Sequence, residues 1–218
     1  MYYIRKALYL YVLIVYSAAH SGSYEDFFSA IKTDDGRAIS QLLARGFDPN
    51  TLNPQGLHGL LLAVNEPSPN VAQVLLTAPK IDVNRLNANG ESPLMMAALK
   101  GELALAEVLV KRGADVNKTG WTPLHYAASN GHVAVIKMLL ENYAYIDAES
   151  PNGSTPLMMA SLYGSLDAVK LLVDEGADPL LKNQKGLTAL EFAKTGERPD
   201  AIQLLEKVTR SKRATGTW

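Results

Sequence analysis

One short segment recurs along the chain, and this recurrence limits the possible folds more than any other feature of the sequence. Three copies are nearly alike, GESPLMMAA at residues 90–98, GWTPLHYAA at 120–128 and GSTPLMMAS at 153–161, and a weaker copy, GLTALEFAK, occupies 186–194. Counting from Gly56, the leading glycines are separated by 34, 30, 33 and 33 residues. Repetition at such a period predicts a stack of similar units, each of which buries its apolar face against its neighbours.

Each unit is expected to contain two short helices joined by a turn. A Ser or Thr directly before Pro, as at Thr122 and Pro123, is typical of a helix start, because the hydroxyl accepts a free backbone N–H and proline has no N–H to lose. Apolar residues three and four positions apart follow, as at Val135, Met138 and Leu139, and predict a second helix. These second helices are expected at residues 103–111, 133–141, 166–174 and 201–208, with glycine-containing turns at 46–50, 113–117 and 176–179.

Three motifs carry a resemblance to a known repeat: Thr-Pro-Leu-His-x-Ala-Ala at residues 122–128, Gly-His at 131–132 and Gly-Ala-Asp-Val-Asn at 113–117. They resemble the ankyrin repeat, and the likeness covers about residues 24–210. It implies an all-α repeat solenoid, an ankyrin stack of about six helix-turn-helix units with β-hairpin loops. The repeats are expected at about 24–54, 55–88, 89–118, 119–151, 152–184 and 185–210, within an ankyrin repeat domain at 22–210 that precedes a flexible basic tail at 211–218.

Some units depart from the motif. The first unit lacks Thr-Pro-Leu-His, and the last has Arg198-Pro199 in place of the turn glycine, so both suit capping repeats. Residues 58–63, HGLLLA, replace the motif in the second unit, whose first helix is therefore expected to be irregularly capped. Three residues are missing between Asn117 and Gly120, which predicts a truncated hairpin.

Residues 1–21 have the layout of a secretory signal peptide, with a positive start, an apolar run at 7–16 and small residues after it. The run is too short to span a bilayer as a helix, which needs about 20 residues. We expect cleavage after Ala19 or Ser21, a periplasmic or secreted mature protein, and no stable membrane insertion after cleavage. A buried or interfacial helix, or a short uncleaved anchor, is the alternative. In this respect the chain is similar to small exported ankyrin proteins of Gram-negative bacteria.

No pattern of catalytic, cofactor-binding or metal-binding residues is apparent. The chain has no cysteine, which excludes disulfides and thiolate metal sites. The ankyrin resemblance implies structural roles for His125 and His132, and His58 is expected on the surface. A formal net charge of -1 and the lack of interleaved basic and aromatic residues argue against nucleic-acid binding. We therefore expect no enzyme activity, no cofactor and no metal.

The resemblance implies a binding surface on the concave side of the stack, at the hairpin tips and the exposed faces of the first helices. The positions that follow a repeat glycine or an Ala-Ala pair are Glu91, Trp121, Ser154, Leu99, Lys100, Ser129, Asn130, Leu162 and Tyr163. The fold does not require apolar side chains at these positions, and an aromatic and aliphatic patch there is typical of a binding hot spot. Trp121 has two interpretations: a contact for a partner at the truncated hairpin, or a side chain that fills the gap left by the missing residues.

These expectations combine into one predicted function. The chain is expected to be a monomeric, non-catalytic protein–protein interaction module, exported from the cytoplasm, that binds an unidentified partner protein through its concave groove and hairpin tips. Two alternatives stay open: a secreted effector-type ankyrin protein that acts on a host or competitor protein and, more remotely, an enzyme with an unrecognised site.

Overall fold

The computed structural model describes residues 22–66 and 68–215. The expected signal peptide at 1–21 lies outside the described residues, and so do residues 216–218 of the expected tail. The chain divides into two compact units, Met1–Ala88 and Asn89–Trp218.

The described part of the first unit is built from helix–turn–helix pairs. A helical segment at 22–32 is followed by α2, and α3 is followed by α4. Their bounds are Gly36–Ala44 for α2, Gly59–Asn65 for α3 and Pro69–Thr77 for α4. Helix α4 packs against both α2 and α3, as repeats stacked on one another require.

An aromatic cluster forms the core of the first repeat. Phe27 is fully buried, with its ring centroid 5.1 Å from that of Phe28 and 4.8 Å from that of Phe47. The Tyr24 ring lies 4.9 Å from Phe28, and its hydroxyl donates a hydrogen bond of 3.2 Å to the Leu52 carbonyl oxygen. Aromatic side chains bury large apolar areas, so this cluster supplies a core to a repeat that lacks the Thr-Pro-Leu-His motif.

The start of α3 confirms one expectation and overturns another. No side chain caps this helix, as its missing motif predicts. His58 was expected on the surface, but it is buried with 1% of its area exposed, and its Nε2 lies 3.2 Å from the Arg85 carbonyl oxygen. The prediction was wrong because His58 directly precedes the helix and faces the next loop, so its ring joins two loops that are far apart in the sequence.

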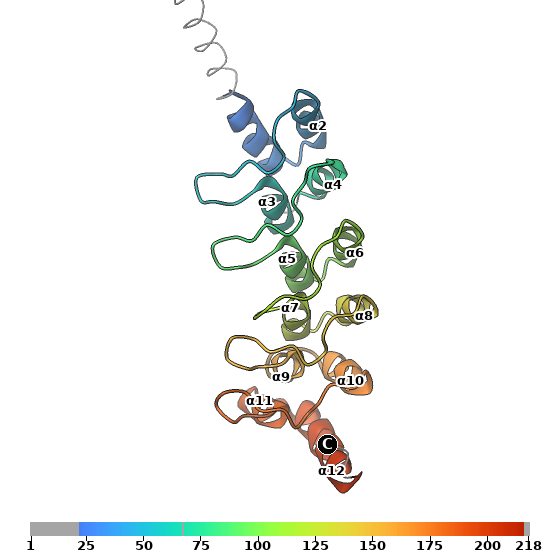
Figure 1. Cartoon of the computed structure of the whole chain (residues 1–218). Helices are drawn as coiled ribbons and strands as arrows, with labels where there is room; N and C mark the ends of the chain where they lie inside the picture. Colours follow the sequence, from blue (N-terminus) through green and yellow to red (C-terminus); the bar gives the residue numbers. More distant parts are fainter. Residues whose placement is uncertain (1–21, 67, 216–218) are drawn as a thin grey trace, which may run out of the picture. The chain divides into compact units, whose positions relative to one another are not determined.

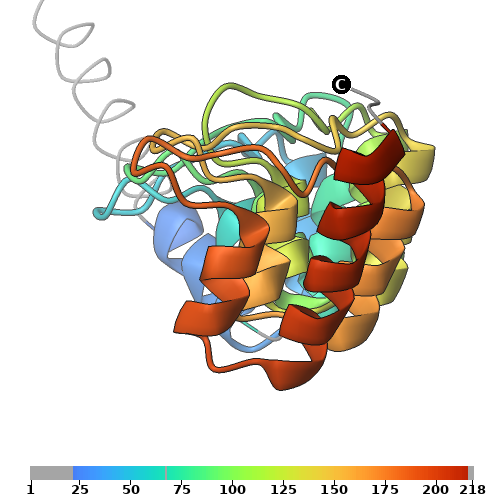
Figure 2. The same ribbon diagram turned by 90° about the horizontal axis from the view of Figure 1, so that it is seen from below.

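The second unit continues the same pattern in two layers of helices. The first helices α5, α7, α9 and α11 pack on one another in sequence, and the second helices α6, α8, α10 and α12 form a neighbouring row (Figure 1). Figure 2 shows the helices of both layers from the side, with the longer loops gathered over one end of the helices. This arrangement confirms the all-α repeat solenoid. The bounds are Pro93–Lys100 (α5), Leu103–Lys111 (α6), Pro123–Ser129 (α7), Val133–Glu141 (α8), Pro156–Leu162 (α9), Leu166–Asp174 (α10), Ala189–Thr195 (α11) and Pro199–Thr215 (α12).

The core of this unit combines small and large side chains. Ala97 and Ala127 are fully buried in the first helices, where their size lets neighbouring backbones approach closely. Leu94, Leu124 and Leu157 stand at the same position of successive repeats and each has 0% of its area exposed. Truncating such a leucine to alanine costs about 2–5 kcal/mol, so this ladder holds the repeats together.

A reciprocal pair of hydrogen bonds sets the start of each first helix of the second unit. The side-chain oxygen of the residue just before the helix accepts from the backbone N–H of the residue three positions later. The side chain of that later residue accepts in turn from the backbone N–H of the residue before the helix. The acceptor differs: a methionine sulfur, an imidazole nitrogen or a carboxylate oxygen fills the same place. Sulfur is the weakest of these acceptors. The pairs are Ser92 with Met95, Thr122 with His125, Thr155 with Met158, and Thr188 with Glu191.

The loops between repeats are hairpin-shaped, but within the described residues they carry no strand. An isolated bridge joins Leu52 and His58 in the first unit. In the second unit the N–H of Asn183 donates to the Leu187 carbonyl oxygen at 3.0 Å, and Asn183 Oδ1 accepts from the N–H groups of Lys185 and Leu187. A side chain thus satisfies the loop backbone, so no strand ladder is needed.

The end of the chain differs from the expected flexible tail at 211–218. Helix α12 continues to Thr215. No Gly or Pro interrupts residues 200–215, and Lys212 Nζ lies 2.9 Å from Asp178 Oδ1 of the preceding loop. The absence of a helix breaker and this ion pair account for the additional helical turns.

Candidate protein-binding site

Trp121 follows a shortened loop that connects α6 to α7. Figure 1 shows this loop reaching less far than the loops before α9 and α11. Lys118 Nζ donates hydrogen bonds to the carbonyl oxygens of Gly90 at 3.3 Å and Trp121 at 3.5 Å. The ammonium group therefore ties the short loop to the loop before it and holds the backbone at Trp121.

His125 provides a fixed surface for the Trp121 ring. The two ring centroids are 5.3 Å apart and the planes meet at 78°. The Thr122 N–H donates to His125 Nδ1 at 3.2 Å, so Nε2 carries the hydrogen and donates to the Ser154 carbonyl oxygen at 2.9 Å. Burial lowers the pKa of His125 to about 4. The imidazole is therefore neutral at physiological pH, and its orientation is locked from both sides.

An open depression of about 230 Å³ adjoins Trp121. It collects side chains from α5, the short loop, α7 and α9, and most of its lining is apolar. Small-molecule pockets are typically about 300–1,000 Å³ and more enclosed, so this depression suits a single side chain of a protein partner. The lining residues are Leu99, Trp121, His125, Tyr126, Ser129 and Met159.

Polar groups at the edge of the depression are already oriented. The Tyr126 hydroxyl donates to Glu91 Oε1 at 3.1 Å. Burial, reinforced by the Glu91 carboxylate, raises the pKa of Tyr126 to about 12, so the hydroxyl keeps its proton. Asn130 Nδ2 lies 3.2 Å from Ser129 Oγ and the same distance from the Tyr126 carbonyl oxygen. Glu91 and Asn130 thus form a polar edge around an apolar centre.

The structure brings together part of the predicted surface. Leu99, Trp121 and Ser129 line the depression, and Lys100 is exposed at the end of α5. Tyr163 is 63% exposed at the end of α9. Leu162, beside it, is half-buried, and neither residue lines the depression.

Ser154 does not belong to a surface, and its inclusion in the predicted site was wrong. Only 1% of its area is exposed. Its N–H donates to Ser150 Oγ at 3.0 Å and its carbonyl oxygen accepts from His125. The position after a repeat glycine is therefore buried in this repeat, where the residue supports His125 from inside.

Three residues of the depression were not among the predicted site residues: His125 was assigned a structural role, and Tyr126 and Met159 were missed. Met159 follows the buried Met158 and is half-buried, so the second methionine of the pair faces the depression while the first one packs in the core. Tyr126 occupies the corresponding place one repeat earlier. Met96 stands at the same position of the repeat before and is buried, so the position in the motif does not by itself identify the residues of the depression.

A second depression, of about 630 Å³, lies in the first unit. Leu57 lines it, and Leu57 follows Gly56 just as Trp121 follows Gly120. Apolar rings and side chains form its walls with charged groups at the edge. The other lining residues are Tyr24, Glu25, Phe28, Ser29, Ile31, Lys32, Asn53, Pro54, Gln55, Leu62 and Glu66. Both units therefore carry an apolar depression at the same position of the repeat.

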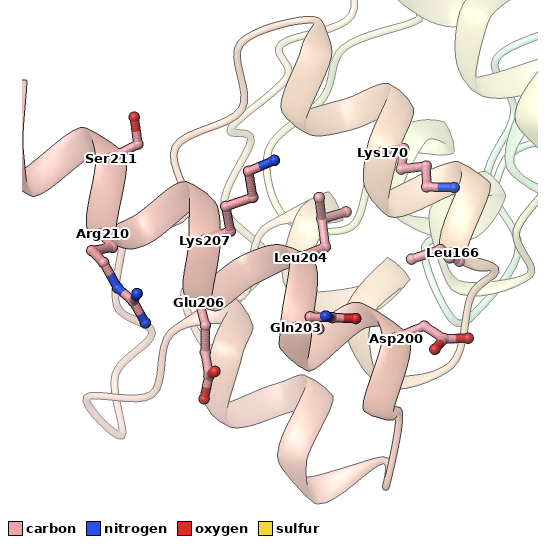
Figure 3. A pocket seen from close by; sticks show the side chains of 9 residues that line it. All are labelled: Leu166, Lys170, Asp200, Gln203, Leu204, Glu206, Lys207, Arg210 and Ser211. Atoms are coloured by element: carbon pink, nitrogen blue, oxygen red, sulfur yellow. The ribbon is translucent and has the colours of Figure 1, made fainter.

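A third depression, about 800 Å³ and open, separates α10 from α12 (Figure 3). Leu166 and Leu204 contribute apolar surface, and charges of both signs surround them. Figure 3 shows Lys207 extending toward α10, while Glu206 and Arg210 point away from it. Because acidic and basic groups alternate here, this depression defines no single chemistry for a ligand.

His132, the remaining histidine of the described residues, also has a structural role, and the same residues offer no metal-binding cluster. His132 Nε2 lies 2.9 Å from the Leu99 carbonyl oxygen, which joins two repeats. Within residues 22–66 and 68–215, no group of three or more His, Cys, Asp or Glu side chains is placed to hold a metal ion. No helix in the same part of the chain has the length and apolar character needed to cross a membrane.

Paired helices, Ser or Thr caps before proline, and histidines that bond to neighbouring loops define a solenoid of helical repeats with open, preformed surfaces. Two family descriptions match the chain: ankyrin repeats (3 copies) at residues 27–119 and 60–150, and ankyrin repeats (many copies) at 144–193. The chain belongs to the ankyrin repeat family. Repeats of this family are generally protein–protein interaction modules and typically non-enzymatic scaffolds.

Similar proteins carry the repeat within much longer chains. A segment of 75 residues is 35% identical to ankyrin repeat and SAM domain-containing protein 6 of Rattus norvegicus, and covers 33% of this chain and 8% of that protein. The corresponding protein of Mus musculus is 33% identical over 75 residues, with the same coverage. The likeness therefore concerns the repeats and spans a small part of these relatives.

Proposed function

We propose that this protein is a non-catalytic interaction module and that a partner protein inserts an apolar side chain into the depression beside Trp121. The observation that supports this most directly is the locked arrangement of Trp121 over His125. An indole that is partly exposed on a rigid support loses little conformational entropy when a partner covers it. Tryptophan in such a place is the residue type most enriched among binding hot spots.

The edge of the depression indicates how the partner would be held. The Glu91 carboxylate and the Tyr126 hydroxyl oxygen, whose hydrogen is donated to Glu91, offer fixed acceptors, and Asn130 and Lys100 are exposed nearby. A loop or extended segment with one apolar anchor and polar flanks matches this layout. The depression of the first unit offers an apolar anchor point of the same kind.

A site-specific crosslinking experiment tests this proposal. A photoreactive residue replaces exposed Asn130, and a matched variant carries it at Val108, which is 41% exposed in α6. We expect one protein to be captured from position 130 and not from position 108. That protein, once purified, should lose at least about 2 kcal/mol of binding free energy on Trp121→Ala. Unchanged affinity in a folded Trp121→Ala variant would exclude the depression as the binding site.

The place of action is part of the proposal. We infer from residues 1–21 that the chain is exported, and that the partner is an extracytoplasmic protein. Cell fractionation combined with sequencing of the mature N-terminus tests this. A mature chain that starts after Ala19 or Ser21 supports export. An intact Met1 in the cytoplasmic fraction contradicts it. A partner found in a host or competitor cell would favour the effector-type function instead.

A further inference from the structure

Two tyrosines dominate the surface of the turn that follows α8. Tyr143 is 86% exposed and Tyr145 is 70% exposed. Tyr143 also has a φ of 63°, in the left-handed region that side chains with a Cβ rarely adopt. An exposed aromatic residue in a strained backbone position needs an explanation other than packing.

The corresponding turns show what these positions normally provide. Where Tyr143 stands, other repeats have glycines with positive φ, namely Gly46, Gly113 and Gly176. Where Tyr145 stands, they have Asp48, Asp115 and Asp178. In the last of these, Asp178 Oδ1 accepts a hydrogen bond of 3.1 Å from the Leu180 N–H and so stabilises the turn. The α8 turn lacks both the glycine and the aspartate, and exposes two rings instead.

The turn holds both rings on a fixed backbone. The Tyr143 N–H donates to the Leu140 carbonyl oxygen at 3.0 Å. The preceding loop adds Asn117, whose Nδ2 donates to the Tyr143 carbonyl oxygen at 2.8 Å and whose Oδ1 accepts from the Tyr145 N–H at 2.8 Å. The strained conformation is therefore maintained from two sides, and both rings project from a backbone that is already held in place.

The charges around this turn differ in sign between the helix before it in the row and the helix after it. Helix α8 ends in Glu141, and the next helix of the row, α10, ends in exposed Asp174, which exposed Glu175 follows. On the other side, α6 ends in Lys111 and Arg112. The rings thus lie between an acidic and a basic edge. A tyrosine face binds a cation, most often a guanidinium, and the carboxylates on the α10 side add to that attraction.

We propose that Tyr143 and Tyr145 form a second interaction surface that binds a basic segment of a partner protein, with an Arg or Lys side chain placed over a tyrosine ring toward Asp174 and Glu175. This surface follows the second helices, whereas the Trp121 depression is built on the first helices. The two sites are therefore separate, and this inference does not depend on the function proposed for Trp121.

Selection from short random peptides displayed on phage tests the inference. The wild-type protein is compared with a Tyr143→Gly/Tyr145→Asp double variant, which restores the residues of the other repeats and is expected to fold at least as well. Peptides selective for the wild type should contain Arg or Lys beside an apolar residue. They should lose about tenfold or more in affinity for the double variant and also weaken on Asp174→Lys/Glu175→Lys.

A Trp121→Ala control separates the two sites. Peptides of the tyrosine surface should bind this variant as well as the wild type, while peptides that it loses report on the depression. The inference is overturned if no peptide distinguishes the wild type from the double variant, or if the selective peptides contain no basic residue.

Discussion

His125 Nε2 donates a hydrogen bond to the carbonyl oxygen of Ser154 in the next repeat; the two atoms are 2.9 Å apart and the residues 29 positions apart in the sequence. Both groups are buried, with 1% of each residue exposed. Breaking a buried hydrogen bond costs more free energy than the bond contributes, because the donor and the acceptor are then left without any partner, water included. This contact therefore joins neighbouring repeats and, at the same time, fixes the imidazole that supports Trp121.

Acidification should weaken the fold through His125. Its pKa is lowered by burial to about 4, below the ordinary value of 6.5, so the unfolded chain binds a proton more readily than the folded one between these values. The contribution of His125 to the free energy of unfolding is then fully present above about pH 6.5, and it declines by roughly 3 kcal/mol as the pH falls toward 4. Urea unfolding followed by circular dichroism measures this decline.

A His125→Gln variant provides the control. It should be less stable than the wild type at pH 7 by about 1–3 kcal/mol, and its stability should depend less on pH between 6.5 and 4. Some dependence should persist, because burial also lowers the pKa of His58. An undiminished pH dependence in this variant would assign the effect to other groups.

Tyr143→Gly should stabilise the protein. Glycine adopts the φ of 63° without the steric conflict of a Cβ, and the left-handed conformation costs other residues about 1–2 kcal/mol. The expected gain in unfolding free energy is about 1 kcal/mol, measured by thermal or urea unfolding. Tyr143→Ala removes the ring but keeps the Cβ. An equal gain in both variants would show that the ring, and not the backbone, is the source of the strain.

Asp147→Asn should also stabilise the protein at neutral pH. The Asp147 carboxylate only accepts: the Asp178 N–H donates to its two oxygens, at 3.1 and 3.2 Å. Asn117, at the same position of the preceding repeat, both accepts a hydrogen bond and donates one to a carbonyl oxygen. Burial, followed by the nearby Asp178 charge, raises the pKa of Asp147. A raised carboxyl pKa means that stability is lost as the pH rises through the folded value.

The side chain of the asparagine variant does not ionise, so it causes no loss of stability as the pH rises, and its Nδ2 can donate as that of Asn117 does. We expect a gain of about 0.5–1.5 kcal/mol at pH 7, which shrinks when the pH falls below the titration range of the Asp147 carboxyl. Unfolding curves at neutral and acidic pH measure the difference. A gain that is the same at both pH values would point to the amide donor alone.

Gly164→Ala should be strongly destabilising. Gly164 lies between α9 and α10, and a Cβ there would meet the Ala128 carbonyl oxygen at 2.3 Å. That oxygen belongs to the backbone of α7 and has little freedom to move away, so the repeats must shift apart. The expected loss is about 2–4 kcal/mol. Gly46→Ala tests backbone strain alone, since its φ is 87° and nothing lies within 4 Å of the added Cβ. A smaller loss at Gly164 than at Gly46 would contradict the packing argument.

The sequence by itself determined the repeat, its period and the start of most helices. Thr122 before Pro123 predicts a cap, and the structure has one there. Gly120 predicts a turn, and its φ is 83°. These features depend on a residue and its nearest neighbours along the chain, because capping hydrogen bonds and left-handed turns are local. The truncated loop before Trp121 follows from a residue count in the same way.

Only the tertiary structure decided which side chains reach the surface. Ser154 is buried against His125 of the preceding repeat and His58 against the loop at Arg85 of the next one, contacts that span 29 and 27 residues. Met159 reaches the depression of Trp121 from another repeat, and Lys212 extends α12 by pairing with Asp178, 34 residues earlier. Local rules do not set such contacts, because they arise when repeats stack and bring distant segments side by side.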